Sequence, residues 1–99
     1  MIVEHAVLSI KPGEEEAFEK AFPEAIPHVA GSGGFVGLEM RRSIERPSVY
    51  HLLIRWRTLE DHTVGFRQSE AFAKWRGVIG PFFASPPEVE HFAEPFATG

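Results

Sequence analysis

Hydrophobic and polar positions alternate along the chain with a period that changes several times. From Ile2 to Ile10, valine, leucine, isoleucine and alanine are interleaved with polar residues, and Lys11-Pro12-Gly13 ends the run. A short run of this composition, closed by a turn signal, is typical of a β-strand. We therefore expect a first strand that is buried on much of both faces.

The period lengthens from Glu14 onward, where hydrophobic residues recur at every third or fourth position. Such spacing predicts an amphipathic helix, with the glutamates and the lysine of this stretch on its solvent side. Pro23 and Pro27 predict a kink or an early end to the helix, because proline lacks the amide hydrogen that a helix interior requires. The hydrophobic positions are Ala17, Phe18, Ala21, Phe22, Ala25 and Ile26.

Two further stretches return to the two-residue period of strands. Phe35 to Ser43 and Ser48 to Trp56 are joined by the short connection Ile44 to Pro47, so the pair predicts an antiparallel hairpin. The glycine-rich stretch Gly31 to Gly34 before them is interpreted as a turn. It lacks the preceding strand and the following Gly-Lys-Ser/Thr of a phosphate-binding loop.

A second helical region follows, and a last strand closes the pattern. Thr58 and Asp61 form a capping pair, and Ser69-Glu70 predicts a second helix start that divides the region in two. Gly80-Pro81 ends the region, and Glu88 to Phe92 alternates as a short strand does.

The order of these elements is strand, helix, strand, strand, helix, strand. Connection rules for this order favour a split βαβ unit, so we predict an α+β, ferredoxin-like βαββαβ fold with an antiparallel sheet. The length of 99 residues suits a single domain, 1–99, with a core of about 2–92 and a C-terminal tail at 93–99. Pairing with a second copy would help so small a chain, with its nine phenylalanines, to bury more surface.

Composition and charge exclude several classes of function. The net charge is −4 and no basic run is present, which argues against nucleic-acid binding, because phosphate recognition needs clustered cations. Cysteine is absent, so disulfides, thiolate metal sites and cysteine nucleophiles are excluded. No stretch approaches the roughly 20 hydrophobic residues of a membrane span. The N-terminus shows no signal-peptide pattern, so a cytoplasmic protein is expected.

Three of the five histidines fall on predicted strands, namely His5, His51 and His91. These strands are neighbours in a ferredoxin-like sheet, so matching registers would gather the imidazoles on one face. Such a group would supply a general base near neutral pH or a metal site. The alternative, which we favour for any single histidine, is a hydrogen-bonded strand or interface residue. No close His-x-His or His-x-x-x-His pair occurs, so no metal site is predicted.

Several short segments between residues 2 and 92 match the pattern of a known family. They are Lys11-Pro12-Gly13, Phe18, Tyr50 to Trp56, Thr58 to Asp61 and Phe66 to Phe72. In these segments the chain resembles the antibiotic biosynthesis monooxygenase superfamily of dimeric α/β barrels. The resemblance implies a sheet covered by helices on one face and by the sheet of a second subunit on the other. A homodimer is therefore the expected assembly.

The resemblance also implies a choice between three activities. Family members include cofactor-independent monooxygenases that oxidise phenolic or quinol-like compounds with dioxygen, haem-degrading monooxygenases, and proteins that bind small molecules. The first is our leading hypothesis, with a small aromatic ligand and no metal, haem or other cofactor. A non-catalytic dimeric barrel that binds a small molecule or serves in a stress response is the alternative.

The haem-degrading branch is the least favoured of the three. Its members carry an asparagine in the first strand, a tryptophan three residues before the serine of the second helical motif, and a histidine four residues after the phenylalanine of that motif. The first strand here has no asparagine, and the other two positions hold Phe66 and Arg76. His62 or His28 would have to reach the iron in place of the missing histidine.

Candidate site residues follow from the monooxygenase hypothesis. His5 or His51 would be the base that deprotonates the substrate, so that the carbanion can donate an electron to dioxygen. Aromatic side chains would shape a dry pocket, although ordinary core is the alternative use for them. The substrate-binding candidates are Trp56, Phe66, Trp75 and Arg76.

Charged residues add further candidates. Asp61 is the only aspartate, so a carboxylate pair would have to use glutamates. Glu4 and Glu39 would serve if they point inward, but exposure is the ordinary expectation for glutamate. Arg55 and Arg76 would hold a carboxylate or enolate oxygen, with surface ion pairs as the alternative.

Overall fold

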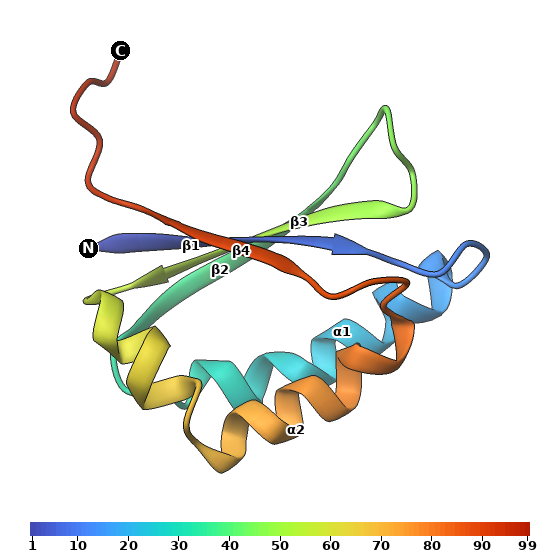
Figure 1. The fold of residues 1–99 in the computed structure, drawn as a ribbon, viewed down its shortest axis with the longest axis horizontal. Helices are drawn as coiled ribbons and strands as arrows, with labels where there is room; N and C mark the ends of the chain where they lie inside the picture. The colour runs from blue at the N-terminus through green and yellow to red at the C-terminus, as the bar shows by residue number, and fades with distance from the viewer.

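Four antiparallel strands form a single sheet in the computed structural model, which describes residues 1–99. The sheet has the order β2-β3-β1-β4, so β1 lies between β3 and β4 (Figure 1). The strands are β1 (Ile2–Ser9), β2 (Phe35–Arg42), β3 (Val49–Trp56) and β4 (Glu88–Phe92). Their ends lie within one residue of the predicted ones.

Two helices, α1 (Glu15–Ala30) and α2 (Glu70–Ile79), pack against each other and cover one face of the sheet (Figure 1). A π-helical segment (Asp61–Phe66) precedes α2, and one 3₁₀ turn (Gly80–Phe82) follows it. The other face, which we call the open face, is covered by no element of the chain (Figure 1). This architecture confirms the predicted α+β, ferredoxin-like βαββαβ fold. No helix combines the length and the hydrophobicity needed to cross a membrane.

Helix α1 continues through both of its prolines to Ala30, so the predicted early end is wrong. Pro23 and Pro27 are exposed, and water can therefore bond the carbonyl groups that the missing amide hydrogens leave free. The opposite side of the helix is firmly held by packing, with Phe18 and Ala25 fully buried. Tertiary packing outweighs the local preference of proline here.

The core lies between the sheet and the helices because alternate strand residues face the helices. In β1 this set includes Ala6 and Leu8, and in β3 it includes Leu52 and Ile54. Burial of hydrophobic surface, at roughly 25 cal/mol per Å², is the main stabilising contribution in such a domain. The buried hydrophobic residues are Ala6, Leu8, Ile10, Phe18, Phe22, Ala25, Val29, Tyr50, Leu52, Ile54, Trp56, Phe66, Trp75 and Ile79.

Both predicted starts in the second helical region are confirmed. The side chains of Thr58 and Asp61 each accept a hydrogen bond from the backbone amide of the other residue, at 3.2 Å. The hydroxyl of Ser69 accepts one from the amide of Phe72 at 3.3 Å, where α2 begins. These bonds satisfy amide groups that the first turn of a helix leaves unpaired. They fix the position of the segment that carries much of the site described below.

Gly34→Ala should destabilise the fold because two constraints meet at this turn. Gly34 has a φ of +84°, and an added Cβ would lie 2.1 Å from Asp61 Oδ2, in the capping carboxylate. Left-handed backbone costs alanine roughly 1–2 kcal/mol, and loss of a helix cap costs about 1 kcal/mol. We expect the free energy of unfolding, measured by urea denaturation, to fall by about 2–3 kcal/mol.

Gly33→Ala is the matched control for this change. A Cβ at Gly33 would meet no atom within 4 Å, and its φ is not positive. A similar loss of stability in both variants would contradict the role assigned to Gly34.

Candidate active site

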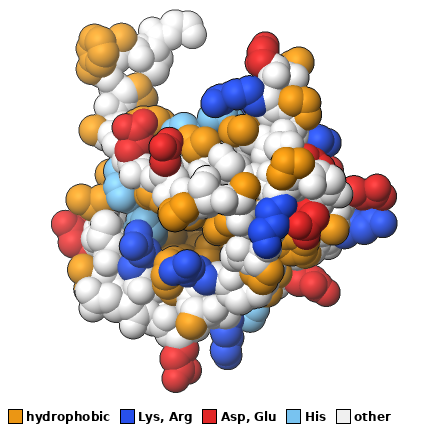
Figure 2. Space-filling view, turned by 45° about the vertical axis from the view of Figure 1, so that its right-hand side comes forward, with side chains coloured by type: hydrophobic (Ala, Val, Ile, Leu, Met, Phe, Trp, Pro, Cys, Tyr) orange, Lys and Arg blue, Asp and Glu red, His pale blue; other side chains and the backbone are white.

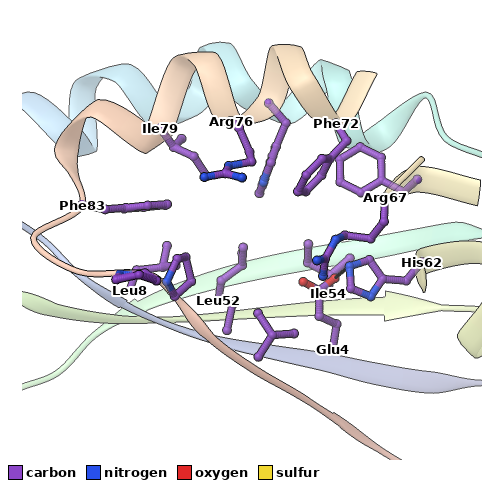
Figure 3. Close-up of a pocket in the computed structure, with 16 residues that line it drawn as sticks. Glu4, Leu8, Leu52, Ile54, His62, Arg67, Phe72, Arg76, Ile79 and Phe83 are labelled. Carbon is purple, nitrogen blue, oxygen red and sulfur yellow. Dashed lines mark ion pairs between the residues drawn. The ribbon is translucent and has the colours of Figure 1, made fainter. Parts of the chain in front are cut away.

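A pocket of about 420 Å³ lies between α2 and the sheet (Figure 3). Helix α2 forms its roof, residues of β1, β3 and β4 form its floor, and Phe83 closes one end. Ten of its 16 lining residues are hydrophobic, which is the usual character of a site for a small organic ligand. The charged and titratable residues among the others are Glu4, His62, Arg67 and Arg76.

Glu4 is the only carboxylate that lines the pocket, and just 6% of the residue is exposed. It is in phase with Ala6 along β1, so the alternation of the strand directs it toward the helices. The indole N–H of Trp56 donates a hydrogen bond to Glu4 Oε1 at 3.0 Å. Figure 3 shows the carboxylate directed toward His62 and Arg67 at the floor of the pocket. A buried carboxylate needs such partners, because the transfer of a charged group from water into the protein interior costs free energy.

Two histidines extend this polar cluster away from Glu4. His62 Nε2 lies 3.3 Å from Glu4 Oε1, and His62 Nδ1 lies 2.8 Å from His91 Nε2. His91 is the cross-strand partner of Glu4 on β4, whereas His62 comes from the π-helical segment and is 2% exposed. The two imidazoles are joined by a hydrogen bond, and His62 is in contact with the Glu4 carboxylate at a longer distance, so the three side chains form a continuous row of polar groups, which we call the Glu4–His62–His91 chain.

Burial shifts the pKa of each member of this chain in the direction that favours the uncharged form of the side chain. The pKa of Glu4 is raised above 4.5 by burial, against the hydrogen bond from Trp56 and the charge of Arg67. The pKa of His62 is lowered to about 4 by burial, with smaller contributions from His91 and Arg67. Burial followed by the charge of Arg67 also lowers the pKa of His91. A carboxylate with a raised pKa is the better general base near neutral pH, and a neutral imidazole can both accept and donate a proton.

The low pKa of His62 predicts a loss of stability in mild acid. An unfolded chain takes up a proton on this histidine as the pH falls below 6.5, whereas the folded protein resists it down to about pH 4. The stabilisation by neutral His62 is therefore complete above pH 6.5 and is lost as the pH falls toward 4. We expect the melting temperature to fall over this window, and His62→Leu to reduce the fall.

Glu4 changes the pH dependence of stability in the opposite direction to His62, because a raised pKa favours the folded state at low pH. For this reason the comparison with the His62 variant, and not the wild-type profile alone, is the test. Thr63→Ala changes the same segment without removing an imidazole and should keep the full pH dependence. A His62→Leu profile that parallels that of the wild type would contradict the prediction.

Two arginines flank an aromatic ring at the rim of the pocket. Arg67 and Arg76 both line it and are exposed. Their guanidinium carbons lie 5.2 Å and 5.9 Å from the ring centre of Phe72. Neither is among the residues that form ion pairs within 4.0 Å. In the space-filling view, basic side chains border a hollow with a hydrophobic floor (Figure 2).

The two histidines predicted as bases lie on the open face, away from the pocket. His5 Nε2 is 2.8 Å from His51 Nδ1, and the two rings stack with centres 5.1 Å apart. Burial and then the charge of His5 lower the pKa of His51. His5 borders a separate hollow of about 300 Å³ beside β4. His91 faces the helices instead, so the three strand histidines do not gather on one face.

Three of the four substrate-binding candidates line the pocket, and the fourth is buried next to it. Phe66, Trp75 and Arg76 line it directly. Trp56 does not line it: its side chain is fully buried next to the pocket, with its ring stacked on His62 at 5.5 Å and its N–H bonded to Glu4. Trp56 therefore holds the polar residues in place and does not form a wall for a ligand.

The expected exposure of Glu4 is wrong, and its partner histidines are residues that the sequence pattern does not bring together. The sequence signal that would have predicted the burial of Glu4 is the alternation of residues along β1, because Glu4 falls on the same side as Ala6 and Leu8. Glu39 and Arg55, the other charged candidates, lie on the opposite phase of their strands, on the open face. Glu39 pairs there with Arg41 at 2.7 Å.

The residues of the pocket do not fit a haem iron. Arg76 occupies the position of the histidine of the haem-degrading branch, and a guanidinium stays protonated and does not ligate iron. His62 is the only imidazole that lines the pocket, and both of its ring nitrogens already contact other groups. No group of three or more histidine, aspartate or glutamate side chains is arranged to hold a metal ion.

The fold and the pocket define a ferredoxin-like α+β protein with a site that can bind a small molecule and accept a proton. Comparison with known families narrows this class, since the family model described as antibiotic biosynthesis monooxygenase matches residues 1–78. The chain belongs to the antibiotic biosynthesis monooxygenase family.

Relatives match over nearly the whole chain. The uncharacterised protein YczJ of Bacillus subtilis is 40% identical over 94 residues, which are 95% of this chain and 99% of the relative. A Bordetella bronchiseptica protein, provisionally named an antibiotic biosynthesis monooxygenase, has a crystal structure with a TM-score of 0.92 at 39% identity, covering 96% of this chain and 97% of that one. SnoaB, a cofactor-independent oxygenase from Streptomyces nogalater, has a TM-score of 0.76 at 17% identity, covering 98% and 94%. At that identity the likeness to SnoaB shows the shared fold alone.

Proposed function

We propose that the protein is a cofactor-independent monooxygenase that oxidises a small aromatic or quinol-like compound with dioxygen in the pocket beneath α2. The observation that carries the proposal is the buried Glu4 carboxylate at the floor of a mostly hydrophobic pocket, in contact with a neutral imidazole. Family membership supports the reaction class, and the cofactor-independent oxygenase SnoaB shares the fold.

The reaction requires only a base and a hydrophobic pocket from the protein, because the substrate supplies the electrons. Glu4 removes a proton from an acidic C–H group, and the resulting carbanion gives one electron to dioxygen. The substrate radical and superoxide combine to form a C–O bond, and the peroxide anion takes the proton back. Loss of water breaks the O–O bond, removes the second proton from carbon and leaves a ketone. A CH₂ group and O₂ thus become C=O and H₂O, while hydrophobic walls protect the carbanion from water.

The geometry favours Glu4 over the predicted bases His5 and His51. A substrate in the pocket is separated from these two histidines by the sheet itself. Single alanine variants of His5 and His51 should therefore keep the oxygen uptake of the wild type. Loss of uptake in these variants, with uptake retained in a Glu4 variant, would move the reaction to the open face.

The direct test is oxygen consumption by the purified protein across anthrones, hydroquinones and related phenols, with and without added haem. We expect protein-dependent uptake that needs neither metal nor haem, with the oxygenated product identified by mass spectrometry. A folded protein that binds these compounds and consumes no oxygen would contradict the monooxygenase and support the alternative of a non-catalytic binding protein.

We also propose that the open face packs against the same face of a second copy to form a homodimer. Two segments extend on the side of the sheet away from the helices, the β2–β3 connection and the C-terminal segment (Figure 1). Each carries a hydrophobic side chain in solvent, Ile44 at 90% exposure and Phe96 fully exposed. A second copy would cover both, together with Phe92 at the edge of the open face.

Light scattering coupled to size-exclusion chromatography tests the assembly. A homodimer should have twice the 11.1 kDa mass of the chain. A particle of 11.1 kDa at micromolar concentration would contradict the proposal.

A further inference from the structure

We infer that the substrate of this pocket is an aromatic compound with a carboxylate group, and that Arg76 binds the carboxylate at the rim. The inference rests on the proposed function for the place of the reaction, and it adds the charge and the orientation of the substrate. Three observations support it: the free charge of Arg76, the different role of Arg67, and the separation of Arg76 from Glu4.

The charge of Arg76 has no partner within the chain. Arg41 and Arg42 each pair with a glutamate, whereas the other five arginines are absent from the ion pairs, and of these five only Arg67 and Arg76 line the pocket. Its side chain lies over the edge of the pocket near Phe72, and Figure 3 shows the guanidinium directed from α2 into the space below the helix. A guanidinium in this position has a planar set of N–H donors that matches a carboxylate in two parallel hydrogen bonds.

Arg67, the other arginine of the rim, is already used by the polar residues of the floor. Its charge acts on Glu4, where it lowers the pKa, and on His62 and His91. Arg76 contributes to none of these shifts. Arg67 therefore acts on the carboxylate of Glu4 without forming an ion pair with it, and Arg76 is the remaining cation in the pocket lining.

The pocket has a cationic rim and an anionic floor, which fixes the direction in which such a ligand binds. A carboxylate at Arg76 stays in contact with water, so its desolvation costs little. A carboxylate at the floor would be repelled by Glu4. The aromatic ring would lie between them against Phe72, Trp75 and Phe83, and would present its far edge to Glu4.

Binding of two matched probes tests the inference without any reaction. 2-Naphthoate and 2-naphthamide have the same ring system and differ in charge, and Trp75 in the pocket wall reports binding through its fluorescence. We expect the wild type to bind the naphthoate at least about tenfold more tightly, the worth of one charge-assisted hydrogen bond. Arg76→Gln should reduce this preference to about twofold or less, whereas Arg57→Gln, which removes an exposed arginine outside the pocket, should keep it.

Equal affinity for the two probes, a preference that survives in Arg76→Gln, or no binding of either probe at millimolar concentration would overturn the inference. The oxygen-uptake assay separates this result from the proposed function, because neither probe is oxidised. Selective naphthoate binding by a protein that consumes no oxygen would support the carboxylate site and contradict the monooxygenase activity. Oxygen uptake with neutral anthrones and no preference for naphthoate would support the monooxygenase activity and contradict the carboxylate site.

Discussion

Glu4→Gln should lower the rate of oxygen uptake by about 10²- to 10⁴-fold, which is the usual contribution of a general base. Glutamine keeps the shape of the side chain and an oxygen that can accept the hydrogen bond from Trp56. It cannot accept a proton at neutral pH, so the substrate would not be deprotonated. The measurement is kcat/KM for the compound that gives the fastest protein-dependent uptake.

The same variant should keep or increase its free energy of unfolding at pH 7. Burial raises the pKa of Glu4, which means that the folded protein disfavours the ionised form, and a neutral amide removes this cost. Glu39→Gln is the matched control, because it removes a carboxylate from the open face. Equal losses of activity in both variants, or an inactive Glu4→Gln that is also unfolded, would contradict the role of Glu4 as base.

Trp56→Ala should cause the largest loss of stability among single changes near the site, about 3–5 kcal/mol. The side chain is fully buried, and its ring packs against Phe35, His62 and Phe66. Since small domains are stable by only about 5–15 kcal/mol, a large share of the total would be lost. Urea denaturation followed by circular dichroism measures the change.

Trp56→Phe separates the packing of the indole from its hydrogen bond. Phenylalanine keeps most of the hydrophobic volume but leaves Glu4 without the N–H donor, at a cost of about 1–3 kcal/mol for the buried acceptor. The alanine variant should therefore be clearly less stable than the phenylalanine variant. Equal stabilities would show that the ring contributes no packing energy.

The fold can be predicted from the sequence because local signals agree with one another. The first run of alternating residues ends at Pro12-Gly13, the second helical region ends at Gly80-Pro81, and a helix begins after Ser69. The prolines of α1 are the exception, since the buried side of that helix holds it together beyond Pro27. A local rule fails there because packing between distant segments outweighs it.

The site can be predicted only in part, because it depends on which face each strand residue occupies. Glu4 and His5 are adjacent, so they face opposite sides of the sheet, and only the phase of the neighbouring hydrophobic residues tells which one is inside. The position of His91 depends on the register between β1 and β4. A strand of five residues contains too little pattern to fix that register alone.

The contacts of His62 with Glu4 and His91 escape prediction for a different reason. No local propensity marks a π-helical turn, and this one is held by the burial of His62 and Phe66 against Trp56. Such turns are rare and are frequent near functional sites, where they place a side chain that a regular helix would direct elsewhere.

The π-helical segment Asp61–Phe66 relates the geometry of the site to the number of residues in this part of the chain. A π-turn contains about one residue more than an α-turn, so deletion of one residue there would leave an ordinary helix between the caps at Thr58 and Ser69. His62 and Phe66 would then stand three positions apart, a spacing that still places both side chains on one face of an α-helix, toward Trp56. In an alignment of relatives, a one-residue gap at this place would therefore mark proteins in which an ordinary helical turn replaces the π-turn between the same two caps.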